Sequence, residues 1–297
     1  MKVATSGDRA LSSLVTVCGL VSLAALSGCE HRAAPSIGPG PAKANTPEVA
    51  HPVDVVAKPL VTEASAEVAK AAVPEPETPA VVESLAVPSD SKASFVRSRD
   101  GKAPVTVFLP GVCSNANAYL QSFPEAARAH GGIVAIDGDT PCPGAPGFHT
   151  FSWDPMKQHE RIENALRAAG LERIPDEGIT IVGYSQGATI AEKLALAHPE
   201  RYTRVVLIGA PTDPSVKSLA KARAVVTSAC SFDVTFRMKT AAKKLEANGV
   251  PSLYVEMPGC THGNVAEGER TFDTAFRFLA ENERPSAAAD VAPTAKN

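Results

Sequence analysis

The chain has 297 residues, a formal net charge of −3 and 44% hydrophobic residues, which is enough apolar material for a domain with a sizeable core. Its 29 basic and 32 acidic residues form no basic stripe with interleaved aromatic residues, so we expect no nucleic-acid partner. Closely spaced cysteine or histidine pairs of the kind that bind zinc are absent, so we expect neither a metal nor another cofactor.

The N-terminus has the pattern of an export signal. Residues 1–10 carry Lys2 and Arg9, and residues 11–26 are apolar or small and uncharged, as in a secretory signal peptide. The sequence Leu-Ser-Gly-Cys that ends at Cys29 resembles a bacterial lipobox. This resemblance implies cleavage before Cys29 and lipidation of that residue, which would anchor the chain to a membrane of the bacterial cell envelope, in the periplasm or at the cell surface. An uncleaved membrane anchor is the alternative.

The segment that follows is typical of a disordered tether. Ala, Pro, Val, Glu and Ser dominate it and aromatic residues are almost absent, so it cannot bury enough apolar surface to offset chain entropy. A polar, Ala-rich tail ends the chain. The expected organisation is therefore a signal peptide at 1–28, a lipidated cysteine and tether at 29–94, one folded domain at 95–281 and a tail at 282–297.

The folded domain alternates short apolar runs with segments of helical spacing. Strands are predicted at 105–109, 133–136, 179–182, 205–208, 224–227 and 252–256, and helices at 117–130, 156–169, 188–197, 240–247 and 267–279. Continuous apolar strands that alternate with helices indicate a parallel sheet covered on both faces. Right-handed crossovers then bring the carboxyl ends of all strands to one edge, where sites form in such folds.

The third of these strands leads into the pentapeptide Gly-Tyr-Ser-Gln-Gly at 183–187, and a helical segment follows at once. Strand, G-x-S-x-G and helix are the parts of a nucleophile elbow. The tight turn strains the backbone of the serine and requires small residues at Gly183 and Gly187. The pattern predicts that Ser185 is a nucleophile at the N-terminus of a helix, whose amides favour developing negative charge. A glycine-rich turn of another α/β fold is the alternative interpretation.

The order of elements, with the elbow serine between the third strand and its helix, resembles a compact α/β-hydrolase over residues 105–279. The hexapeptide Gly-Tyr-Ser-Gln-Gly-Ala is similar to that of cutinases, small carboxylesterases and phospholipase-like hydrolases. The resemblance implies about six mostly parallel strands with helices on both faces and no large lid domain. The two leading antiparallel strands of larger members are expected to be absent or reduced, with residues 95–97 as a remnant of one.

A serine nucleophile needs a base, and the base needs an acid that holds its tautomer. α/β-Hydrolases carry these residues in the chain order Ser, acid, His. Of the two histidines after Ser185, His262 lies in a glycine-rich loop after the last predicted strand, whereas His198 ends the elbow helix and is expected to face solvent away from the site. We expect His262 to be the base. Asp233, after the fifth strand, is the expected acid, with Asp213, after the fourth, as the alternative.

The tetrahedral intermediate of acyl transfer needs two backbone N–H donors. The residue after the nucleophile, Gln186, is expected to supply the first. The family resemblance places the second at Val112, in the loop after the first predicted strand, with Cys113 as the neighbour that could replace it.

Of the six cysteines, one leaves with the signal peptide and Cys29 is the lipid acceptor. The other four form an even number in an exported domain, which suggests disulfides, and three pairings are open. All four follow strand ends on the same edge of the sheet. We favour the pair Cys230 and Cys260, which joins the loop of Asp233 (the acid loop) to the loop of His262 (the base loop). The second pair is then Cys113 and Cys142. Cutinases also staple the acid loop with a disulfide.

Together these residues predict an exported, monomeric serine hydrolase that cleaves carboxylic esters, small or polymeric, through an acyl-serine intermediate. No long insertion is available to build a lid, so we expect an open site. Phe148, Phe151 and Trp153 form the wall of an acyl pocket or simply pack within their loop. The alternatives are a catalytically silent binding lipoprotein with a hydrolase fold, or a thioesterase or peptidase, because the triad does not fix the acyl group.

Overall fold

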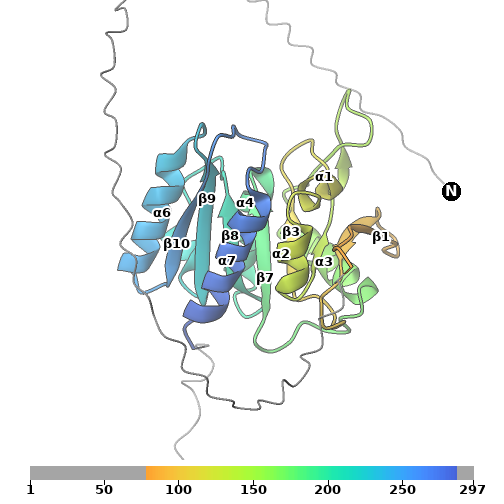
Figure 1. Ribbon diagram of the computed structural model, residues 1–297, viewed down its shortest axis with the longest axis horizontal. Helices are drawn as coiled ribbons and strands as arrows, with labels where there is room; N and C mark the ends of the chain where they lie inside the picture. The colour runs from red at the N-terminus through yellow and green to blue at the C-terminus, as the bar shows by residue number, and fades with distance from the viewer. Residues whose placement is uncertain (1–77, 286–297) are drawn as a thin grey trace, which may run out of the picture. The chain divides into compact units, whose positions relative to one another are not determined.

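The computed structural model describes residues 78–285 (Figure 1). The expectations for the signal peptide, for the lipidated Cys29, for most of the tether and for the C-terminal tail lie outside the described residues. The centre of the described part is an eight-stranded sheet in the order β1-β2-β4-β3-β7-β8-β9-β10. Its strands are β1 Glu83–Leu85, β2 Ala93–Val96, β3 Thr106–Leu109, β4 Ile133–Ala135, β7 Ile179–Tyr184, β8 Tyr202–Ile208, β9 Ala224–Cys230 and β10 Ser252–Met257.

Six neighbouring strands of this sheet are parallel to one another, namely β4, β3, β7, β8, β9 and β10. They are the six strands that the apolar runs predict, because a strand buried on both faces needs apolar residues at nearly every position. Their carboxyl ends therefore share one edge of the sheet, as expected. The fold class predicted from the sequence is confirmed in this respect.

The folded part begins earlier than residue 95. Strands β1 and β2 form an antiparallel pair, and β2 pairs in turn with β4, so residues 83–94 belong to the sheet and its connection rather than to the tether. The expected remnant at 95–97 is part of a complete strand that is buried along its whole length. The domain also ends later than residue 281, because Arg204 and Arg223 both form ion pairs with Glu283.

Helices cover both faces of the sheet, and α2 and α7 lie in front of it in Figure 1. The apolar side chains of α3, α4, α5 and α6 join the cluster on one face, and those of α1, α2 and α7 join the cluster on the other. The bounds are α1 Ala116–Leu120, α2 Pro124–Ala129, α3 Pro155–Ala168, α4 Gln186–Ala197, α5 Val216–Leu219, α6 Thr235–Ala247 and α7 Gly268–Asn282.

Two local predictions are wrong. The single helix expected at 117–130 is broken into α1 and α2, because Pro124 has no N–H to continue α1 and instead occupies the first turn of α2. The helix expected from residue 240 begins at Thr235. Helix α5 and a two-stranded ribbon, β5 Thr140–Pro141 and β6 His149–Thr150, were not predicted from the sequence, since each is too short to show a period.

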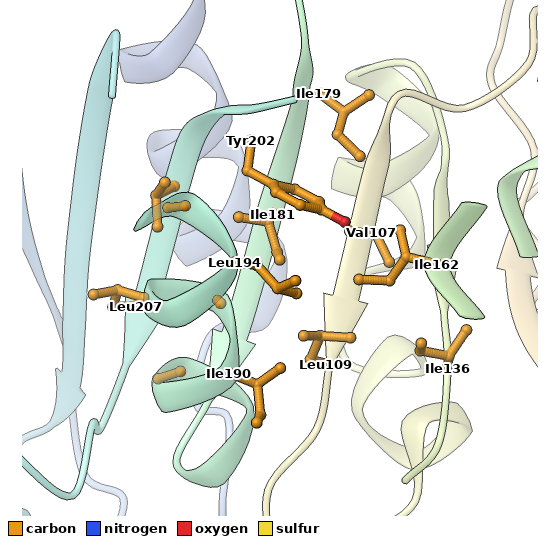
Figure 2. Close-up of a cluster of buried hydrophobic side chains, with 14 of the residues drawn as sticks. Val107, Leu109, Ile136, Ile162, Ile179, Ile181, Ile190, Leu194, Tyr202 and Leu207 are labelled. Carbon is orange, nitrogen blue, oxygen red and sulfur yellow. The ribbon is translucent and has the colours of Figure 1, made fainter. Parts of the chain in front are cut away.

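The larger cluster packs α3 and α4 against the middle of the sheet (Figure 2). Side chains from strands β3, β7 and β8 meet side chains from the two helices, and most of them are fully buried. Removing methylene groups from such a position costs about 2–5 kcal/mol for a change to alanine, so this cluster holds the elbow strand and its helix in place. The labelled members are Val107, Leu109, Ile136, Ile162, Ile179, Ile181, Ile190, Leu194, Tyr202 and Leu207.

A stacked pair of histidines lies near the amino end of β8. The rings of His159 in α3 and His198 after α4 have centroids 4.0 Å apart and planes at 13°. The Nδ1 atom of His159 lies 2.7 Å from the hydroxyl oxygen of the buried Tyr202. His198 is thus remote from the elbow serine, as expected, but it packs against a neighbour and its Nε2 atom is buried.

This pair should make the protein less stable in weak acid. Burial lowers the pKa of His159, and the charge of His198 lowers it further, so the unfolded chain binds a proton that the folded chain resists. The stabilisation is complete above the unfolded pKa of about 6.5 and is lost as the pH falls below it, by about 1.4 kcal/mol for each unit by which the folded pKa is depressed. Urea unfolding measured between pH 7.5 and pH 5 should show this loss, and a His159→Gln protein should lose less. If the free energy of unfolding fell equally with pH in the two proteins, this explanation would be contradicted.

Candidate active site

The turn between β7 and α4 has the geometry of a nucleophile elbow. Ser185 has φ 52° and ψ −113°, a left-handed conformation that costs free energy in a residue with a side chain. A Cβ atom added to Gly183 would lie 2.3 Å from the carbonyl oxygen of Gly187, and one added to Gly187 would lie 2.0 Å from that of Leu109. Both glycines are therefore required, and the serine is held at the N-terminus of α4.

Three side chains from separate loops form one chain of hydrogen bonds at the carboxyl edge of the sheet. Ser185 Oγ lies 2.9 Å from His262 Nε2, and His262 Nδ1 lies 2.7 Å from Asp233 Oδ2. Asp233 Oδ1 accepts a second bond from the backbone N–H of Val234 at 2.6 Å. With a carboxylate at Nδ1, the imidazole carries its proton there and leaves Nε2 free to accept the serine proton.

Burial differs along this chain of side chains. Ser185 is buried, the Asp233 side chain is 12% exposed and the His262 side chain is 45% exposed. The carboxylate is therefore shielded from water while the imidazole faces the opening of the site.

The structure separates the two candidate acids. Asp213 lies after β8, where its carboxylate forms an ion pair with Arg237 at 3.1 Å and its side chain is 73% exposed. It takes no part in the hydrogen bonds of His262, which are made by Asp233 and Ser185. Asp233, and not Asp213, is thus the carboxylate that contacts the imidazole, and its role as the acid stays a prediction.

Gly209 was missed in the sequence although it touches the site. It follows β8 directly and has φ 52°, and an added Cβ atom would lie 3.1 Å from Asp233 Oδ2 and 3.2 Å from His262 Nδ1. Any larger residue would press on the hydrogen bond between these two side chains. A glycine immediately after a buried strand was the available signal, because such a position often marks a close backbone approach.

One of two disulfides ties the loop of Asp233 to the loop of His262. Cys230 pairs with Cys260 at a Cα–Cα distance of 5.0 Å, and Cys113 pairs with Cys142 at 5.5 Å. These are the two pairs favoured from the sequence. The first is reinforced by a hydrogen bond from the N–H of Phe232 to the carbonyl of Cys260 at 3.0 Å. The acid loop and the base loop therefore form one unit.

Two tyrosines hold the backbone that follows His262. The hydroxyl of Tyr184 accepts from the N–H of Gly263 at 2.8 Å and donates to the carbonyl of Asn264 at 3.1 Å. The hydroxyl of Tyr119 donates to the carbonyl of Gly263 at 3.2 Å. Burial raises the pKa of Tyr184, which keeps its hydroxyl protonated as a donor. Tyr184 lies inside the elbow motif, yet nothing in the sequence indicates this contact.

The change Tyr184→Phe should therefore weaken catalysis more than binding. It leaves the ring in place but removes both bonds to residues 263 and 264, so the base is less well aligned with Ser185. We expect kcat to fall by about tenfold, since an unpaired backbone group costs about 1–3 kcal/mol, with little change in KM. The control is Tyr254→Phe, which removes only an exposed bond to Glu256. An equal effect of both variants, or an effect on KM alone, would argue against this role.

The side chain of Gln186 fastens the neighbouring ribbon. Its Oε1 accepts from the hydroxyl of Thr150 at 2.9 Å and from the N–H of Phe151 at 3.0 Å, and its Nε2 donates to the carbonyl of Phe151 at 3.2 Å. The residue is buried and begins α4, so its own N–H belongs to the unpaired first turn of a helix. This is the position that the sequence assigns to the first oxyanion donor.

Val112 lies in a loop that passes beside the serine. A Cβ atom added to the preceding Gly111 would lie 3.4 Å from Ser185 Cβ, and the following Cys113 has a left-handed φ of 49° and is held by its disulfide. Val112 is exposed, so its role would rest on the backbone. That it supplies the second oxyanion donor stays a prediction.

A cavity of about 380 Å³ lies between α1 and the base loop. Of the three aromatic residues considered for a pocket wall, only Phe148 contributes to it. Phe151 is buried in the core cluster, and Trp153 packs against the ammonium group of Lys193, which lies 4.7 Å from its ring centroid. Phe151 and Trp153 thus make packing contacts, and the hypothesis that the three aromatic residues form the wall of an acyl pocket stays a prediction.

Residues 78–285 contain no group of three or more His, Cys, Asp or Glu side chains arranged to hold a metal ion. Within the same range, no helix combines the length and the apolar character needed to span a membrane.

Comparison with known proteins agrees with this architecture. Residues 104–229 match the family model described as the alpha/beta hydrolase fold. Carboxyl esterase 2 from Tuber melanosporum superimposes with a TM-score of 0.50 at 13% identity, over 70% of this chain and 89% of that one. A predicted CIB-like hydrolase from Thermoplasma acidophilum gives 0.49 at 15% identity, over 68% and 98%. An esterase from Pyrobaculum calidifontis gives 0.47 at 15% identity, over 69% and 85%.

At 13% identity the likeness to the Tuber melanosporum esterase concerns the fold alone. In sequence, 82 residues are 32% identical to formate–tetrahydrofolate ligase from Bifidobacterium longum, which is 28% of this chain and only 16% of that protein. A match to so small a part of the ligase assigns no activity. The sheet, its helices and the family match establish that the chain has the α/β-hydrolase fold, without a large separate lid domain among the described residues.

Proposed function

We propose that the protein is an exported serine hydrolase that cleaves carboxylic esters through an acyl-serine intermediate. The observation that carries this proposal is the unbroken chain of hydrogen bonds from Ser185 through His262 to Asp233, at 2.9 and 2.7 Å. Ser185 lies in a strained turn at the carboxyl edge of the sheet, which is where the sites of α/β folds lie. A catalytically silent binding protein would gain nothing from this alignment, and the strain at Ser185 would only cost it stability.

Each residue has a defined task in the proposed reaction. Ser185 Oγ attacks the ester carbonyl while His262 Nε2 removes its proton, and His262 then returns the proton to the leaving alcohol. Asp233 keeps the imidazole in the required tautomer and stabilises it when it is charged. The N–H groups of Gln186 and Val112 donate to the oxyanion, and losing one such donor costs about 3–4 kcal/mol in the transition state. Water then releases the acyl group by the same route.

We further propose that the enzyme works as a monomer in a bacterial cell envelope. The proposed site is built from one chain only, and two disulfides are typical of proteins that leave the reducing cytosol. The proposed signal peptide at 1–28 and the lipid on Cys29 would then attach the domain to a membrane, through the tether that precedes the sheet.

Covalent labelling tests this function directly. A fluorophosphonate probe should react with the purified protein at one site, and peptide mapping should place the added mass on Ser185. The protein should also hydrolyse p-nitrophenyl acetate, and labelling should abolish that hydrolysis in proportion. A protein that is neither labelled nor active on short esters would be the silent binding protein instead.

A further inference from the structure

We propose that the cavity between α1 and the base loop binds a sugar-like, neutral and hydroxyl-rich alcohol part of the ester. This inference rests on the proposed function and names its substrate class. One wall contains Cys113 and Ser114, which follow the proposed oxyanion donor Val112. The opposite wall contains Gly263 and Asn264, which follow the proposed base.

The position of the cavity assigns it to the leaving alcohol. In the proposed reaction His262 returns its proton to the leaving oxygen, so that oxygen must lie within hydrogen-bond reach of Nε2. The cavity wall begins at the next residue, Gly263. A group bonded to the leaving oxygen would thus enter this cavity, whose volume of about 380 Å³ is within the usual range for small-molecule sites.

The lining combines polar and apolar side chains and carries no charge. None of the residues around the cavity is Asp, Glu, Lys, Arg or His, so a charged group would find no ion-pair partner in the lining. Hydroxyl and amide side chains lie beside the apolar Ala118, Phe148 and Val265, a mixture that suits a ligand with both hydroxyl groups and C–H faces. The polar side chains are those of Ser114, Asn115, Tyr119, Ser122 and Asn264.

Two amides of the lining have unused hydrogen-bond capacity. Asn115 Oδ1 caps α1 by accepting from the N–H of Ala118 at 3.1 Å, which leaves its Nδ2 without a partner among the described residues. Asn264 Nδ2 donates to Thr261 Oγ1 at 3.1 Å, which leaves Oδ1 as an acceptor. Each amide is fixed by the half that is in use, so a donor and an acceptor are available at little entropic cost. Paired donors and acceptors suit hydroxyl groups.

Phe148 adds a fixed aromatic face. Its side chain is in the cavity lining and the residue is 43% exposed. Its backbone is held at both ends, by bonds from the N–H of Cys142 to its carbonyl at 2.9 Å and from its own N–H to the carbonyl of Ala145 at 3.1 Å. A sugar ring has apolar C–H faces and hydroxyl edges, and it matches an aromatic ring beside polar side chains. A simple alkyl alcohol offers only apolar C–H groups and no hydroxyl edge.

The test compares two esters with the same acyl group. Ethyl acetate and 6-O-acetylglucose share the acetyl group, so a difference in kcat/KM reports the alcohol part. We expect the sugar ester to be favoured by at least about tenfold. Phe148→Ala should reduce this preference by about tenfold, and Asn115→Ala should reduce it as well. The control Trp153→Ala removes an exposed aromatic residue outside the cavity and should leave the preference as it is.

The outcomes separate this inference from the proposed function. Equal kcat/KM for the two esters, or a preference unaffected by Phe148→Ala, would overturn the sugar assignment while the esterase stands. Failure of both esters, together with no fluorophosphonate labelling, would overturn the esterase and with it the alcohol assignment. Calorimetry on the Ser185→Ala protein gives a second measurement that needs no turnover. It should show binding of 6-O-acetylglucose, and heat equal to that of ethyl acetate would contradict the proposal.

Discussion

Replacing Ser185 with alanine should lower kcat for ester hydrolysis by about a million-fold. The variant keeps the elbow, because alanine occupies the same left-handed conformation with the same Cβ atom and removes only the oxygen that attacks the ester. The oxyanion donors and the substrate cavity remain, so binding should survive. Turnover of p-nitrophenyl acetate under single-turnover conditions and at steady state measures the loss.

The control for this result is Ser91→Ala. Ser91 lies in the connection between β1 and β2, far from the site in sequence, and its hydroxyl bonds only to the half-buried Asp90, so its removal should leave turnover unchanged. Both proteins should give the same far-ultraviolet circular dichroism spectrum as the parent. If Ser185→Ala retained more than about one hundredth of the parent kcat, a loss of less than about 3 kcal/mol, another group would have to be the nucleophile.

Replacing Asp233 with asparagine should lower kcat by about ten-thousand-fold. The side chain keeps its size, but an amide nitrogen near His262 Nδ1 favours the tautomer with the proton on Nε2. His262 Nε2, which lies 2.9 Å from Ser185 Oγ, can then no longer accept the proton of the serine. The pH profile of kcat, measured with p-nitrophenyl acetate, should lose the limb that reports the base.

Asp213→Asn is the matched control, since it makes the same chemical change in the residue that the sequence offers as the alternative acid. It removes an exposed ion pair with Arg237, and such pairs contribute about 0–1 kcal/mol. We expect kcat within about threefold of the parent. The opposite ranking of the two variants would return the acid role to Asp213.

Much of the fold could be predicted because its signals are local. Each parallel strand is an apolar run buried on both faces, and the elbow combines a strand, a fixed motif and a helix in adjacent residues. The break at Pro124 was missed although its signal is local, since proline cannot continue a helix. Strand β1 was not readable, because three residues of mixed polarity resemble the tether in composition and become a strand only by pairing with β2.

The parts of the site that escaped prediction depend on contacts between distant segments. Tyr119 reaches Gly263 across 144 residues, and no pattern in either segment indicates the other. The choice between Asp213 and Asp233 was open for the same reason, since both follow strand ends and only the folded chain brings Asp233, and not Asp213, to His262. Gly209 shows its role only when Asp233 and His262 are placed against it.

The four paired cysteines make the site depend on where the chain folds. The crosslinks span sequence separations of 29 and 30 residues, and each restricts the unfolded chain by roughly 3–4 kcal/mol. They lie in the loops that carry the proposed acid, base and oxyanion donor, whereas the elbow serine lies between a strand and a helix that the buried apolar cluster holds together. Reduction of the two disulfides should therefore loosen the loops that carry the proposed acid, base and oxyanion donor more than it loosens the elbow.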